Sequence, residues 1–102
     1  MNTLIVLFNL KKDAESDAYE AWAKATDLPV VRGLSSVDSF EVYRSQGLFG
    51  GGAAPYEYVE MIDINDVDQF GTEVGSAIMA KVAGEFQGFA DNPVFILTSK
   101  FS

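Results

Sequence analysis

A chain of 102 residues with a formal net charge of −8, no cysteine and no histidine fits one small acidic domain over residues 1–102. The missing cysteines and histidines exclude disulfides, Cys- or His-ligated metals, thiolate nucleophiles and Ser-His-Asp triads. Because an acidic surface repels phosphate backbones, we expect no nucleic acid partner. We also expect neither a metal nor a cofactor.

The sequence also argues against a membrane partner. No apolar run approaches the ~20 residues that a membrane helix needs. The chain opens directly into strand-like residues with no basic segment before them, so we expect no signal peptide. These features predict a cytoplasmic protein.

The first predicted elements are a strand and a helix. Residues 3–10 (TLIVLFNL) are apolar on both alternating faces, which is typical of a central strand covered on both sides. Residues 13–26 predict a helix that begins at an N-cap, Asp13. The apolar face of this helix is expected to consist of Ala14, Ala18, Trp22 and Ala25.

The middle of the chain predicts a hairpin. Residues 27–36 contain proline and glycine and are expected to form a loop. Residues 37–45 alternate like a strand that is exposed on one side. Residues 46–55 are a glycine-rich connector, and residues 56–64 form the next strand, paired with the previous one.

The last predicted elements are a second helix and a strand. Asn65 or Asp66 caps the helix, and Gly84 and Gly88 are expected to fray its end. Its apolar face comprises Val67, Phe70, Val74, Ile78 and Val82. Residues 94–101 (VFILTSKF) form the final strand.

The order of these elements is β-α-β-β-α-β, the pattern of α+β ferredoxin-like domains. With right-handed crossovers, both helices fall on one face of the sheet. The sequence therefore predicts a four-stranded antiparallel sheet with two helices on one face.

The other face of this sheet predicts a homodimer. In the first strand, Leu4 and Val6 point one way while Ile5 and Leu7 point the other, and residues 94–97 repeat this pattern. Two helices can cover only one side, so a large apolar patch would face water in a monomer. Pairing two sheets face to face buries that patch.

Polar and aromatic side chains point to a ligand site between the helices and the sheet. We predict the ligand-binding residues Asn9, Trp22, Tyr43 and Tyr58, near the glycine-rich segment 47–52. Asn9 interrupts an apolar strand, and it either contacts a ligand or marks the exit of the strand. Trp22 forms either an aromatic wall of the pocket or part of the core. Segment 47–52 joins two strands and so cannot be a phosphate cradle; a lid or a hairpin tip fits it better.

Carboxylates on the third strand offer the only other chemistry. Glu57 and Glu60 differ by three positions, so they point to opposite faces and cannot form a pair. One of them could act as a general acid or base if its pKa were raised. The simpler interpretation is a solvated strand edge.

The opening segment, TLIVLFNLKKDAESDAYEAWAKATDLPVVRGLSSVDSFEVYR at 3–44, and the strand YEYVEMIDI resemble the REDY-like proteins. These include the HapK and PigK proteins of prodiginine pigment clusters, and the similarity extends over residues 3–101. The resemblance implies a dimeric α/β-barrel fold. It also implies a place in red tripyrrole antibiotic biosynthesis, on the bipyrrole branch.

Three functional hypotheses follow. The first is an accessory or tailoring protein that binds a flat, pyrrole-type aromatic intermediate, with any catalysis limited to proton transfer by Tyr or Glu. The second is a non-catalytic chaperone or scaffold for another biosynthetic enzyme, using the acidic surface. The third is a cofactor-free monooxygenase, as in the wider dimeric group that the family resembles. Many of those enzymes place a histidine in the pocket, and this chain has none.

Overall fold

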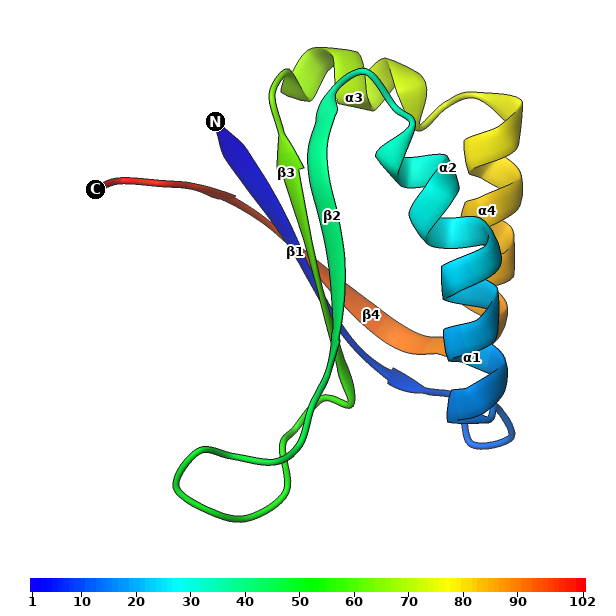
Figure 1. Cartoon of the computed structure of the whole chain (residues 1–102), viewed down its shortest axis with the longest axis vertical. Helices are drawn as coiled ribbons and strands as arrows, with labels where there is room; N and C mark the ends of the chain where they lie inside the picture. The colour runs from blue at the N-terminus through cyan, green and yellow to red at the C-terminus, as the bar shows by residue number, and fades with distance from the viewer.

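The computed structural model describes residues 1–102 and consists of a four-stranded antiparallel sheet with all its helices on one side (Figure 1). The strands lie in the order β2-β3-β1-β4. Their bounds are β1 (Asn2–Leu10), β2 (Val37–Arg44), β3 (Tyr58–Ile64) and β4 (Ala90–Ser99). The α+β ferredoxin-like fold expected from the sequence is confirmed, with β1 and β3 as the central strands.

The first helical layer is longer than the sequence predicted. It runs without a break through α1 (Ser16–Trp22), the π-helical segment η1 (Ala23–Asp27) and α2 (Leu28–Arg32). The loop expected at 27–36 is therefore wrong for most of its length. Pro29 lies in the first turn of α2, directly after the π-helical segment.

The buried face of this layer also differs from the expected one. Tyr19, Ala23, Asp27 and Val31 are its buried residues. They are four residues apart, a wider spacing than the 3.6 residues of an α-helical turn, and the wider π-helical turn keeps them in line. The predicted apolar face is wrong at two of its alanines, because Ala18 and Ala25 are exposed.

The second helical layer consists of two helices instead of the single one predicted. Helix α3 (Val67–Glu73) is capped by Asp66, and α4 (Ala77–Phe89) is capped by Ser76, whose side chain accepts from the Met79 N–H. The glycines expected to fray the end lie inside α4, and β4 follows α4 directly at Ala90. No helix is both long and apolar enough to cross a membrane.

The core fills the space between the helices and the covered face of the sheet. One cluster gathers around Phe8, Tyr19 and Tyr58, and a second around Phe40 and Ile62. On the opposite face no helix covers the sheet (Figure 1). The strand register places six apolar side chains on that face: Ile5, Leu7, Val59, Met61, Val94 and Ile96.

A long loop joins β2 and β3 and curves away from the helices, to the lower left in Figure 1. Gly47, Gly51 and Gly52 have positive φ angles there, which other residues adopt only at a cost. Phe49, in the same loop, is fully exposed. The hairpin pairing of β2 with β3 expected from the sequence is confirmed.

Candidate functional site

A cavity of about 290 Å³ lies between the helical layer and the covered face of the sheet. Twelve of its sixteen lining residues are hydrophobic, and they come from the sheet and from both helical layers. Two of the remaining residues are carboxylic acids, Asp27 and Glu60. Neither lysine nor arginine lines the cavity, so the two acids have no counter-charge there.

Glu60 enters the cavity from strand β3. Tyr58, Ile62 and Ile64 share its face by alternation, and all of them are buried. Only 5% of the Glu60 surface is exposed. The solvated strand edge expected for Glu60 is therefore wrong, because β3 pairs on both sides and its inner face lies under the helices.

Asp27 enters the cavity from the opposite wall, at the end of the π-helical segment. Its exposed fraction is also 5%, and no protein donor forms a hydrogen bond to its carboxylate. Tyr19 lies eight residues before Asp27 on the same face of the helix. Its hydroxyl donates a hydrogen bond to Oε2 of Glu60 at 3.2 Å. The helix thus supplies one group that holds Glu60 and one acid that shares the cavity with it.

Burial changes the acidity of both carboxyl groups. Burial raises the pKa of Glu60 to about 8; the nearby Asp27 charge raises it as well, while the hydrogen bond from Tyr19 partly offsets the rise. Burial raises the pKa of Asp27 to about 6. Near pH 7 the site therefore holds a protonated Glu60 and an ionised Asp27 inside an apolar cavity. Such a pair can donate one proton and accept another.

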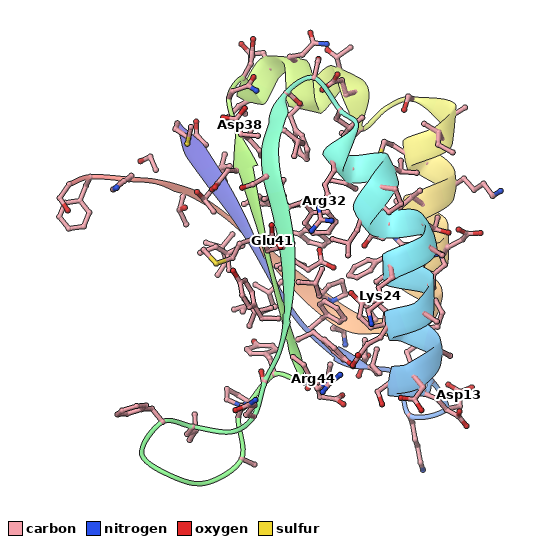
Figure 2. All side chains as sticks on the ribbon, in the orientation of Figure 1. Asp13, Lys24, Arg32, Asp38, Glu41 and Arg44 are labelled. Atoms are coloured by element: carbon pink, nitrogen blue, oxygen red, sulfur yellow. The ribbon has the colours of Figure 1, made fainter.

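Two arginines lie outside the cavity, beside strand β2. Figure 2 shows Arg32 on α2 next to Glu41 on β2, and Arg44 at the far end of that strand. Arg32 pairs with Glu41 at 3.2 Å, and Arg44 Nε donates to Glu20 at 2.8 Å. These partners leave the two buried acids without neutralisation.

A second cavity of about 280 Å³ lies beside the first and is more polar in character. Tyr19 lines it together with Lys24, Arg44, Glu20 and Tyr58. The Tyr58 hydroxyl donates to Glu20 at 2.6 Å. Tyr19 therefore belongs to the wall of this cavity while its hydroxyl holds Glu60 in the other.

The structure does not bring the four predicted ligand-binding residues together. Asn9 accepts from the Glu57 N–H and donates to the Pro55 carbonyl. Trp22 donates to Glu85, while Tyr43 is half-exposed on the uncovered face of the sheet.

Of the four, only Tyr58 lines a described cavity, the second one. Trp22 is a neighbour of the first cavity, because its ring stacks on Phe86 with centroids 6.5 Å apart and Phe86 lines that cavity. The ligand-binding role of Asn9, Trp22, Tyr43 and Tyr58 stays a prediction.

Sequence reasoning missed Asp27 and Tyr19. Asp27 was assigned to a loop, and Tyr19 was not on the predicted helix face. The available signal was the four-residue spacing of Tyr19, Ala23, Asp27 and Val31, which continues past the start of the expected loop.

The whole chain matches one protein family. The family model of the REDY-like protein HapK covers residues 2–101. The chain is 29% identical to HapK from Hahella chejuensis, with a TM-score of 0.78 over 100% of this chain and 95% of that one. No curated protein matches it.

More distant structures share the fold alone. An ethyl tert-butyl ether D (EthD) family protein from Bacillus halodurans is 15% identical, with a TM-score of 0.79 over 99% of both chains. A dimeric ferredoxin-like protein of unknown function from Thermobifida fusca is 15% identical, with a TM-score of 0.75 over 97% of this chain and 90% of that one.

Proposed function

Because the chain belongs to the REDY-like HapK family, we propose that it is an accessory or tailoring protein of prodigiosin-type tripyrrole biosynthesis. In this role it binds a flat aromatic bipyrrole intermediate. The ligand occupies the cavity between the helices and the sheet.

The observation that carries this proposal is the combination of an apolar cavity with two buried acids. A cavity of about 290 Å³ is near the lower end of the usual range for small-molecule sites, which suits a two-ring ligand. Pyrrole rings offer apolar faces and N–H donors. Asp27 offers carboxylate oxygens that no protein donor bonds and that stay accessible in the cavity lining, so a ring N–H would find an acceptor there.

We further propose that the protein works as a homodimer. The fold neighbours include proteins described as dimeric, and the uncovered face of this sheet carries six apolar side chains. Apposition of two such faces would bury them and leave the cavity, on the helical side, free for ligand.

A fluorescence titration of the single tryptophan tests the binding proposal. Trp22 stacks on Phe86, a wall of the cavity, so a bound ring should quench its emission. We expect saturable quenching by a methoxy-bipyrrole aldehyde near one ligand per chain. Asp27→Asn should weaken binding several-fold, because it removes the carboxylate that accepts the ring N–H, whereas Asn9→Ala should leave it unchanged.

The alternatives give different outcomes in the same experiment. Loss of binding in Asn9→Ala with no effect of Asp27→Asn would place the ligand beside Asn9, one of the four ligand-binding residues predicted from the sequence. Absence of quenching would contradict the proposal. The acidic surface would then favour a scaffold for another biosynthetic enzyme, detected as salt-sensitive co-purification.

A further inference from the structure

The two acids in the cavity differ from ordinary ligand-binding carboxylates in their arrangement. They approach from opposite walls, Glu60 from the sheet and Asp27 from the helix, and each is only 5% exposed. Tyr19 holds one oxygen of Glu60 at 3.2 Å and leaves its other oxygen without a protein donor. A ring placed between the walls would therefore meet a carboxyl group on each side.

We propose that Glu60 and Asp27 act as proton donor and proton acceptor, and that the protein catalyses cofactor-free proton-transfer isomerisation of a planar ring carbonyl compound held in the cavity. This activity rests on the proposed function, because it needs the same cavity to bind a pyrrole-type ring. It goes beyond binding by giving each acid a chemical task.

The electrostatics of the cavity suit Glu60 as the proton donor and Asp27 as the proton acceptor. Burial leaves Glu60 protonated and Asp27 ionised near pH 7, with pKa values of about 8 and 6. The titratable groups facing Glu60 are Tyr19 from α1 and Asp27 from η1, with Tyr58 next to it on the same face of β3; Gln87 is the polar lining residue on α4 and carries no charge. With no cation in the lining, neither acid is locked into an ion pair.

The proton transfers balance without another reactant. For a lactam such as 4-methoxy-3-pyrrolin-2-one, the Asp27 carboxylate takes a proton from the ring CH₂ group. The electron pair of that C–H bond becomes a new ring double bond, and the existing C=C bond shifts to the carbonyl carbon. The carbonyl oxygen takes the proton of the Glu60 carboxyl group. The product is the hydroxypyrrole tautomer, and nothing is oxidised or reduced. The step leaves Asp27 protonated and Glu60 ionised, and proton exchange of both acids with water restores their starting forms.

Hydrogen–deuterium exchange of this lactam tests the inference directly. In D₂O the reverse transfer returns deuterium to the ring carbon, so the CH₂ proton signal disappears from the NMR spectrum. We expect the wild-type protein to accelerate this exchange at least about 100-fold over buffer. Glu60→Gln and Asp27→Asn should each remove most of the acceleration. Asp17→Asn, an exposed acid on α1, is the matched control and should leave it unchanged.

The pH profile supplies a readout that a purely structural role would not move. Exchange should rise with pH as Asp27 ionises near pH 6 and fall as Glu60 ionises near pH 8. Tyr19→Phe removes a hydrogen bond that lowers the Glu60 pKa, so the alkaline limb should move to higher pH. A flat profile, or an alkaline limb that Tyr19→Phe does not move, would contradict the assignment of Glu60.

The outcomes separate this inference from the proposed function. If the lactam quenches Trp22 saturably but its exchange is not accelerated, the acid–base role is wrong and the binding role stands. Acceleration that survives both Glu60→Gln and Asp27→Asn also overturns the inference. If neither the lactam nor the bipyrrole aldehyde binds, both proposals fail.

Discussion

The raised pKa of Glu60 follows from its position between Tyr58 and Ile62 on a strand whose inward side chains are all buried. A carboxyl group in that position loses its hydration, and this loss destabilises the charged form more than the neutral form. One hydrogen bond from Tyr19 offsets only part of this cost. The fold thus accepts a destabilising residue at the centre of its covered face, as is common at functional sites.

This cost makes the stability of the protein depend on pH. The folded-state pKa of Glu60, about 8, lies above its unfolded value near 4.3, so the folded state holds an extra proton. The associated stability is fully present below the unfolded pKa and is lost as pH rises through 8. We expect the contribution of Glu60 to the free energy of unfolding to fall between pH 5 and 9 by on the order of 4 kcal/mol.

Urea denaturation from pH 5 to 9 measures this fall. Glu60→Gln keeps the acceptor for Tyr19 but cannot ionise, so its stability should change little between pH 7 and 9. The exposed Glu41→Gln is the control and should follow the wild-type curve. Parallel curves for wild type and Glu60→Gln would contradict the burial argument.

Among the elements, the second helical layer is tied to the turn before β2 by one carboxylate. Glu73, at the end of α3, accepts hydrogen bonds from the backbone N–H groups of Ser35 and Ser36, both at 3.0 Å, and from both serine hydroxyls. The hydrogen bonds from the two serines lower the pKa of Glu73 to about 2. This contact links the two layers that enclose the cavity.

We expect Glu73→Gln to lower the urea midpoint at pH 7, since an amide offers one oxygen in place of two. The folded pKa lies below the unfolded one, so the contribution is present above pH 4.3 and is lost as pH falls through 2. The wild-type advantage should therefore shrink between pH 4.5 and 2. Glu57→Gln, which keeps its single bond to the Leu10 N–H, should show a smaller effect at pH 7. An equal effect of the two variants would contradict a stabilising role for the hydrogen bonds between Glu73 and the two serines.

The strands were predictable from the sequence and the helix details were not, for physical reasons. Alternation in β1 and β3 has a strict period of two, so the covered and uncovered faces follow from residue parity. The first helical layer departs from a period of 3.6 through its π-helical segment. The sequence pattern therefore predicted neither that Asp27 is helical nor that the helix extends to Arg32. The cap at Ser76 divides the second layer after a short turn that the apolar pattern does not interrupt.

The candidate site was less predictable than the fold because it depends on how the layers meet. Glu60 was noticed on its strand, but its burial follows from the helical layer above it. Tyr19 and Asp27 both face Glu60 only because the helical face keeps a spacing of four residues. Asn9 drew attention as a polar break in β1, and its side chain instead holds the start of β3 through Pro55 and Glu57.

At the scale of the whole molecule, the uncovered face of the sheet is the surface that we propose for the homodimer. Met61 and Ile96 flank Ile5 in one row across this face, with exposed fractions of 39% and 43% in the single chain. In a face-to-face homodimer this row would lie near the centre of an interface, where an unpaired charge costs several kcal/mol. Met61→Lys should therefore weaken dimerisation at least about 100-fold.

Light scattering after size exclusion measures the effect. We expect the wild type at twice the chain mass of 11.1 kDa and Met61→Lys at the single-chain mass, with an unchanged far-ultraviolet circular dichroism spectrum. Ile78→Lys, at a residue 50% exposed on α4, is the control on the helical side and should stay dimeric. If Met61→Lys stays dimeric while Ile78→Lys becomes monomeric, the subunits pair through their helices. The cavity, which helix α4 lines, would then lie near the interface, and the partner subunit could affect ligand access.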